Sequence, residues 1–306
     1  MRGFIGLTKR NILIFFKDKQ SVIFSLLTSI IVLALYLLFL KGTFIDAMND
    51  AVNGNTGLSE LIKDSEINML ANLVLLTGII GSAMITVPYN CLTTVVKDRE
   101  NKKDYDVLST PIKRWQVILS YFTAASLSSV ILTGIILTVG ILAIRLQGSI
   151  FLGATDILAA YGVAVLGSVS ATALFMILVL CFNSTGASGA FFGILSAVSG
   201  FVIGAYVPIS QFSGSIQTVC NIFPASHVTI ILRNVLMNGI LEHMNTSLGG
   251  LDKGMFVESI KNIFGFKAHL TNRDLNLEEM IAYVLCIIGI SVIVQILIFS
   301  KTYKKK

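Results

Sequence analysis

Long charge-free stretches are the feature of this sequence that most constrains its fold. Five stretches of 20 to 76 residues contain no Asp, Glu, Lys or Arg: residues 21–40, 67–96, 115–144, 157–232 and 280–300. A helix rises about 1.5 Å per residue and the hydrocarbon core of a bilayer is about 30 Å thick, so about 20 such residues make one crossing. Because 54% of the residues are hydrophobic and 13% are charged, we predict an all-α polytopic membrane protein.

The longest stretch contains its own break points. Residues 182–189, Phe-Asn-Ser-Thr-Gly-Ala-Ser-Gly, are polar and include glycine, which is typical of a tight connection. This break predicts one span over residues 157–181 and another over 188–207. Two prolines and many polar residues in 208–232 disfavour a further crossing, so we expect a re-entrant pair of short helices there. The predicted number of spans is therefore six.

The distribution of charge predicts the orientation. An even number of spans places residues 1–19, 97–114 and 301–306 on the same side of the membrane. These segments hold 15 of the 23 Lys and Arg residues but 5 of the 17 Asp and Glu residues. Under the positive-inside rule, both termini are expected in the cytoplasm of a protein of the cell membrane.

The segments outside the spans suggest three further structures. Residues 1–19 alternate apolar and basic residues at near-helical spacing, which favours an interfacial helix over a plain basic flank that fixes topology. Residues 41–66 form an acidic connection rich in Asn and Gly. Residues 237–279 form a predicted extracellular loop with one apolar helical face, which could be a lid or could shield the bundle. That face consists of Phe256, Val257, Ile260, Ile263 and Phe264.

The loop 97–114 is the most informative soluble segment. It is about half charged with alternating signs, and Thr110 and Pro111 can cap and open a new helix. Such a corner would transmit a push directly into the second and third spans. A solvated connection without a partner is the alternative.

Several kinds of chemistry find no support in the residues. Acidic and basic residues are missing from the span centres, which argues against a proton-coupled carrier or an ion channel. The sequence has no Gly-Lys pair and hence no P-loop, and its three His and four Cys form no HExxH or CxxC arrangement. A membrane-embedded enzyme would need clustered catalytic groups. We expect no cofactor or metal on this chain, and sparse basic residues argue against nucleic acid as a partner.

The fifth span contains two pairs of glycines at four-residue spacing. This pattern lets helices approach closely, within one subunit or across a dimer. The glycines are Gly189, Gly193, Gly200 and Gly204.

Taken in order along the chain, these features resemble the ABC-2 type permeases, the transmembrane subunits of type V ABC exporters. The basic helix from Lys9-Arg10 to Lys17-Asp18 matches one motif, and Arg99-Glu100 followed by Leu108-Ser-Thr-Pro111-Ile matches a second. A fifth span that runs into a proline-containing re-entrant segment matches a third. The sequence departs from the family pattern in two places. It has Lys103-Asp104 where the family commonly has Gly-Thr, and its segment 237–279 is longer than in many members.

The resemblance implies one transmembrane domain over residues 1–306 that acts in a homodimer or heterodimer within the lipid bilayer. A separate cytoplasmic ABC ATPase would hold ATP and Mg²⁺ and drive export of a hydrophobic or amphipathic drug, antimicrobial peptide or lipid. Export of a lipid-linked glycan is an alternative, and an ATP-independent channel or carrier is another. The implied ATPase-coupling residues are Arg99, Glu100, Lys102, Asp106, Leu108, Thr110 and Pro111. The implied outer-gate residues are Pro208, Asn221, Pro224 and Arg233.

Overall fold

The computed structural model describes residues 2–53, 61–148, 151–249, 254–270 and 273–302. Within these ranges, six helices are long and apolar enough to cross a membrane, which confirms the predicted all-α polytopic fold. The spanning helices are α2 (Lys19–Leu35, continued by the π-helical turn Tyr36–Leu40 and α3, Lys41–Asn53), α4 (Asp64–Glu100), α6 (Arg114–Gln147), α7 (Ala154–Val179), α8 (Thr185–Val202) and α12 (Leu277–Thr302).

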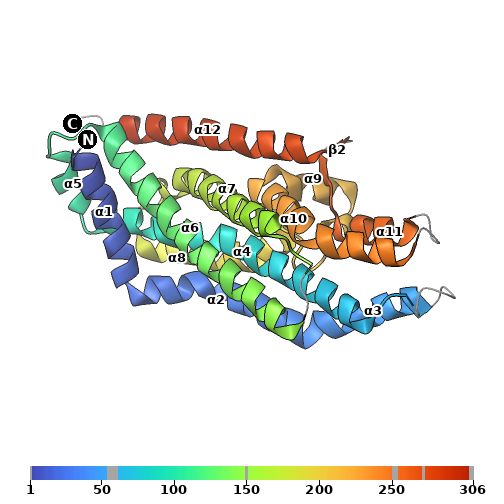
Figure 1. Ribbon diagram of the computed structural model, residues 1–306. Helices are drawn as coiled ribbons and strands as arrows, with labels where there is room; N and C mark the ends of the chain where they lie inside the picture. Colours follow the sequence, from blue (N-terminus) through green and yellow to red (C-terminus); the bar gives the residue numbers. More distant parts are fainter. Residues whose placement is uncertain (1, 54–60, 149–150, 250–253, 271–272, 303–306) are drawn as a thin grey trace.

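The helices run roughly lengthwise in one elongated bundle (Figure 1). At one end, which we call the terminal end, lie α1 (Arg2–Lys17), the short helix α5 (Lys103–Leu108) and the last turn of α12. At the opposite or distal end lie α3 and α11 (Met255–Phe264). Helix α1 ends before Asp18, changes direction from α2 and packs across α6.

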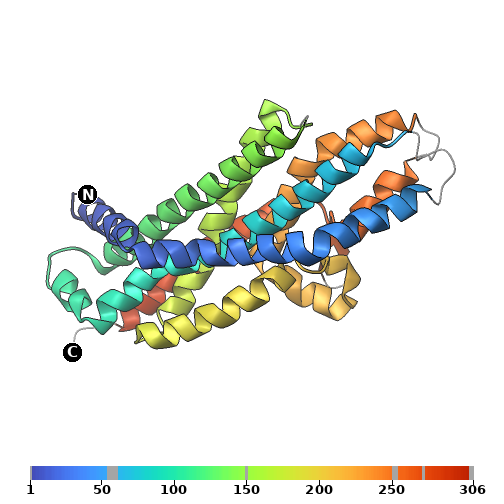
Figure 2. The same ribbon diagram turned by 90° about the horizontal axis from the view of Figure 1, so that it is seen from below.

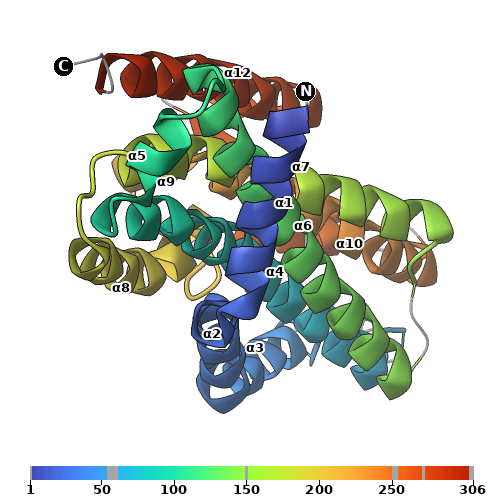
Figure 3. The same ribbon diagram turned by 90° about the vertical axis from the view of Figure 1, so that its left-hand side faces the viewer.

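Helix α4 is the central element of the bundle. Viewed from the terminal end, it is surrounded by α2, α6, α7, α8 and α10 (Figure 3). Its apolar core residues, such as Leu70, Leu73, Ile80 and Leu92, are fully buried. Pro88 lies inside this helix and is tolerated because neighbouring helices enclose it. A movement of α4 would therefore reach most of the bundle.

The first span extends further than expected. The charge-free stretch ends at Leu40, but the helix continues to Asn53. Lys41 does not stop a helix, and the continuation buries Met48 against the core and packs Phe44 edge-on against Phe264 of α11. The predicted connection 41–66 is thus largely helical in its described part.

The re-entrant segment consists of a short 3-10 turn, η2 (Ile209–Gln211), α9 (Gly214–Ile222) and α10 (Pro224–Ser247). Helices α9 and α10 meet at 96°, and α10 then runs toward the distal end (Figure 2). The second helix is longer than the prediction, which ended at residue 232. It continues because its buried face packs on α4 and α7.

The predicted loop 237–279 is mostly folded. It contains the second half of α10, helix α11, and a hairpin of β1 (Ala268–Leu270) and β2 (Arg273–Leu275). Val257, Ile260 and Phe264 of α11 are buried in the distal core, whereas Ile263 is 45% exposed. The apolar face recognised in the sequence therefore packs against the distal core of the bundle.

Candidate functional site

The last turn of α4 connects more elements than any other charged segment described at the terminal end. We call its four consecutive charged residues, Lys97 to Glu100, the α4 anchor. Each of them binds a partner distant in the sequence, and the partners lie on α1, on the α1–α2 elbow and on the α7–α8 connection.

Asp98 fixes α1 and α6 to α4. Its carboxylate accepts two hydrogen bonds from Arg10, at 2.6 and 3.1 Å, and one from the Tyr121 hydroxyl at 2.7 Å. Asp98 is 4% exposed, so these partners compensate for the burial of its charge. The hydrogen bond to Asp98 raises the pKa of Arg10 above its ordinary value.

Lys97 reaches the elbow between α1 and α2. Its ammonium group forms an ion pair with Asp18, which also caps α2 by accepting hydrogen bonds from the Ser21 amide at 3.2 Å and hydroxyl at 2.8 Å. Partial burial alone would raise the pKa of Asp18, but the hydrogen bonds from Lys97 and Ser21 lower it to about 2. The elbow is thus held by a carboxylate that stays ionised.

Arg99 and Glu100 bind the connection between α7 and α8. Arg99 donates to the carbonyls of Leu180 at 2.6 Å and Phe182 at 2.9 Å, just past the end of α7. Glu100 accepts from the Thr185 amide at 3.2 Å and hydroxyl at 2.6 Å, where α8 begins. A cation at a helix C-terminus and an anion at a helix N-terminus both interact favourably with the helix dipole. These side chains, predicted to dock an ATPase, bind their own chain here.

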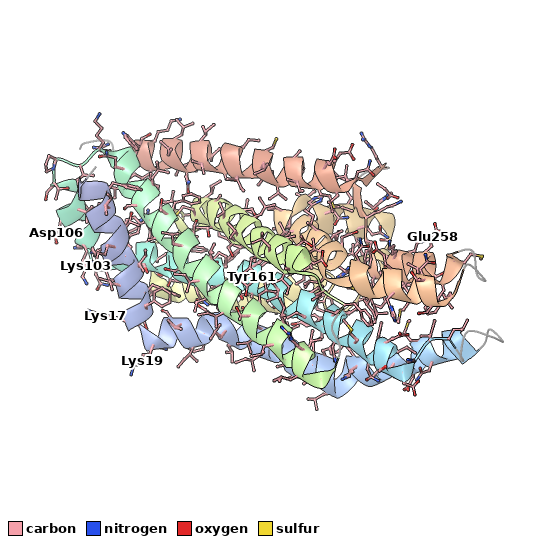
Figure 4. All side chains as sticks on the ribbon, in the orientation of Figure 1. Lys17, Lys19, Lys103, Asp106, Tyr161 and Glu258 are labelled. Atoms are coloured by element: carbon pink, nitrogen blue, oxygen red, sulfur yellow. The ribbon has the colours of Figure 1, made fainter. Side chains whose placement is uncertain are left out.

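Helix α5 follows the anchor directly. The chain turns through Lys102, whose φ of 59° is left-handed, and Lys102, Lys103 and Asp106 are exposed. Lys103 and Asp106 mark the outermost part of the terminal end, whereas Glu258 marks the distal end and Tyr161 lies between them (Figure 4).

The end of this loop differs from its predicted form. Thr110 does not cap a helix, since its hydroxyl donates to the Val107 carbonyl at 2.5 Å. Helix α6 begins at Arg114, with Lys113 as its N-cap, so Pro111 precedes the helix. The side chain of Leu108 lies outside the described residues.

A cavity of about 360 Å³ borders the anchor between α2, α4 and α8; we call it the anchor cavity. Asn90 in its wall is 6% exposed, and its amide nitrogen has no hydrogen-bond partner in the described structure. The lining residues are Gln20, Ser21, Phe24, Asn90, Thr93, Lys97, Thr185, Ser188, Gly189 and Phe192. Lys97 and Thr185 therefore belong both to the anchor contacts and to the cavity wall.

The four residues predicted to shape an outer gate lie in the re-entrant segment, and two of them bind α11 or the hairpin that follows it. Pro208 precedes η2, and Pro224 is the first residue of α10. Asn221 donates to the His269 carbonyl at 2.8 Å. Arg233 is 2% exposed and binds the carbonyls of Phe264 and Gly265 at the end of α11. The re-entrant segment, α11 and the hairpin are thus tied together.

The glycines of the fifth span do not form one helix-packing stripe within the subunit. A Cβ at Gly189 or Gly193 would meet no atom within 4 Å in the described structure. Gly200 instead makes room for the Tyr206 ring, which would lie 2.2 Å from a Cβ. Gly204 lies beyond the end of α8 with a φ of +69°, so the predicted second pair is not helical.

A comparison with protein families decides the identity of the chain. The model of the "ABC-2 family transporter protein" family matches residues 45–301, which is more than half of the sequence. The chain belongs to the ABC-2 transporter family. A comparison with curated proteins finds no match.

Membership of the ABC-2 family makes this chain a multi-pass membrane transport subunit whose partner is an ABC ATPase. The matched region contains the α4 anchor, α5 and the re-entrant segment, whereas Arg10 and Asp18 precede it. Among the described residues, no group of three His, Cys, Asp or Glu side chains could hold a metal ion.

Sequence reasoning missed the partners of the anchor and the cavity residue Asn90. Arg10 and Thr185 lie 88 and 85 residues from their partners, and no local pattern indicates such pairs. The signal available for Asn90 was an amide side chain within the charge-free stretch 67–96.

Proposed function

We propose that this ABC-2 protein is the permease subunit of an ATP-driven exporter in the cell membrane. Two permeases, as a homodimer or heterodimer, would work with two copies of a separate cytoplasmic ATPase that holds ATP and Mg²⁺. The cargo would be a hydrophobic or amphipathic molecule, such as a drug, an antimicrobial peptide or a lipid.

Charge supports a cytoplasmic position of the terminal end. In the described part of the chain, 12 of the 23 basic residues lie in the segments 2–19, 97–114 and 301–302, which are at this end or adjoin it. Orientation rules place such an excess of Lys and Arg on the cytoplasmic side. Helix α5 would then face the ATPase.

The observation that carries the proposal is the continuity from exposed α5 through the α4 anchor into the central span. Lys102, Lys103 and Asp106 offer charges to a partner, and the adjacent anchor binds α1, the elbow and the α7–α8 connection. A displacement of α5 by ATPase closure would therefore move α4 and reach these elements through the anchor contacts. Packed elements with discrete contacts transmit such movements.

The anchor cavity supports an amphipathic cargo. Phe24 and Phe192 provide apolar surface, and Asn90 provides an unused amide donor. The charge of Lys97 in the cavity wall is already paired with Asp18. Because Lys97 and Thr185 also belong to the anchor contacts, movement of α4 would reshape this cavity and drive alternating access.

The test is a charge reversal on α5. We expect Lys103→Glu with Asp106→Lys to abolish co-purification of the cognate ATPase and ATP-dependent transport in proteoliposomes, with an unchanged thermal unfolding midpoint. Lys19→Glu is the matched control, since Lys19 is exposed at the same end but lies on α2. Retained ATPase association in the double variant, or transport by the purified chain without any ATPase, would refute the proposal.

A further inference from the structure

A second cavity, of about 490 Å³, lies toward the distal end between the first span, α4 and α6; we call it the distal groove. Its walls are almost entirely aliphatic. Ile30, Leu37, Ile135 and Val139 line it and are 52 to 61% exposed, so the groove opens sideways from the bundle toward lipid. No part of the proposed transport path uses it.

The distal end of the groove is polar. Lys41, Asn72 and Gln147 line it there, and the Asn72 amide donates to the Gln147 side-chain oxygen at 2.9 Å. Lys41 is the only charged residue in the lining, and within the described residues it forms no ion pair. Lys41 directly follows the charge-free stretch of the first span. At this depth in the membrane, cationic side chains reach the lipid headgroups.

A polar cavity of about 680 Å³ adjoins this end and shares Asn72, Ile144 and Gln147 with the groove. Lys63 and Glu66 line it, and Glu66 pairs with His243 at 2.9 Å. The two cavities together form an apolar groove that ends in a polar pocket.

We propose that the distal groove is a binding site for an anionic glycerophospholipid of the distal leaflet. An acyl chain would lie along Ile135 and Val139, and the phosphate would bind the Lys41 ammonium and the neighbouring amides. From Leu132 to Gln147, the α6 wall is about 22 Å long at 1.5 Å per residue, enough to cover the roughly 15 Å depth of one leaflet. With the orientation proposed above, this is the outer leaflet.

The charge and shape of the groove favour a lipid over a second copy of the chain. A single unpaired cation at the headgroup level complements a phosphate, whereas a symmetric partner would bring a second Lys41 to the same interface. The groove also lies between three helices and has a volume of about 490 Å³, which suits a flexible acyl chain better than a helix about 10 Å wide.

Native mass spectrometry of the detergent-solubilised full chain tests the site with dioleoylphosphatidylglycerol as the probe. We expect saturable binding that Lys41→Gln weakens about tenfold, as expected for the loss of one charge-assisted contact. Val139→Trp, which fills the groove at a residue 61% exposed, should weaken it at least as much. Lys19→Gln and Leu142→Trp are matched controls, since neither residue lines the groove.

Thermal unfolding provides a second readout, because a ligand that binds the folded state raises its unfolding midpoint. The phosphatidylglycerol-induced rise should be smaller in Lys41→Gln and persist in both controls, and dioleoylphosphatidylcholine should produce a smaller rise in the wild type. Equal binding by wild type, Lys41→Gln and Val139→Trp would overturn the inference. Loss of a permease dimer in Val139→Trp without saturable lipid binding in the wild type would also overturn it, since a second copy would then cover the groove.

Discussion

Arg10 and Asp98 lie 88 residues apart and form a two-point ion pair that fastens the first helix to the end of the central span. The side chain of Asp98 is 5% exposed and that of Arg10 is 31% exposed. The amphipathic helix expected to lie in the interface is therefore also bound to the bundle by a partly buried charge pair. Any force on the last turn of α4 acts on α1 through this contact.

Removal of Arg10 should destabilise the protein. Arg10→Ala leaves the Asp98 carboxylate buried with the Tyr121 hydroxyl as its remaining donor, and we expect a loss of about 2 kcal/mol, below the value for a fully buried pair because Arg10 is partly solvated. The measurement is thermal or denaturant unfolding in detergent. Lys9→Ala, at an exposed neighbouring position, should change stability by less than about 0.5 kcal/mol. Equal effects of the two substitutions would contradict the assigned role of the pair.

The contact between Glu100 and Thr185 should couple α4 to the start of α8. Glu100→Gln and Thr185→Val should each cost up to about 1 kcal/mol, and the double variant should cost less than their sum because both remove the same contact. In proteoliposomes, each variant should retain ATP hydrolysis by the partner while transport per ATP falls. Additive stability effects with unchanged coupling would show that the contact does not transmit force.

Asn90 should contribute to cargo binding in the anchor cavity. Asn90→Leu removes the unpartnered amide, so the concentration of cargo that half-maximally stimulates ATP hydrolysis should rise about tenfold, as for the loss of one buried hydrogen bond. A panel of amphipathic compounds in the reconstituted complex provides the measurement. Thr86→Val is the control, since Thr86 is buried one turn away and its hydroxyl binds the Ser82 carbonyl at 3.0 Å. A normal response of Asn90→Leu to every stimulating compound would remove Asn90 from the proposed site.

The exposed glycine face of α8 should form the seam between two permeases. Gly189→Leu with Gly193→Leu adds side chains where the described structure has open space, so monomer stability should be unchanged while dimers are lost. Size-exclusion chromatography with light scattering measures the change. Gly289→Leu on exposed α12 should leave dimers intact. Dimers that survive the double substitution would place the seam elsewhere.

The spans could be predicted because charge-free length is a direct measure of bilayer crossing. All six occur close to their expected positions, and the apolar face of α11 was recognised from its spacing. The extension of α10 to Ser247 was missed because Arg233 ends the charge-free stretch and polar residues follow it, whereas burial against α4 and α7 sustains the helix. Tertiary packing overrides such local signals.

The charged loop illustrates what local patterns leave undetermined. Its exposed members, Lys102 and Asp106, are where a docking surface was expected. Arg99 and Glu100 look equally available in the sequence, yet their partners are helix ends that only the fold brings near. Charge type alone does not separate a residue that faces a partner from one that caps a neighbouring helix.

Topology labelling tests the central claim most directly. Lys103→Cys and Glu258→Cys mark the terminal and distal ends, and each is made in a chain whose exposed Cys181 and Cys286 are replaced by Ser. With an impermeant maleimide, we predict that Glu258→Cys reacts in intact cells and that Lys103→Cys reacts only after permeabilisation. Reaction of Lys103→Cys in intact cells, with Glu258→Cys protected, would contradict the account.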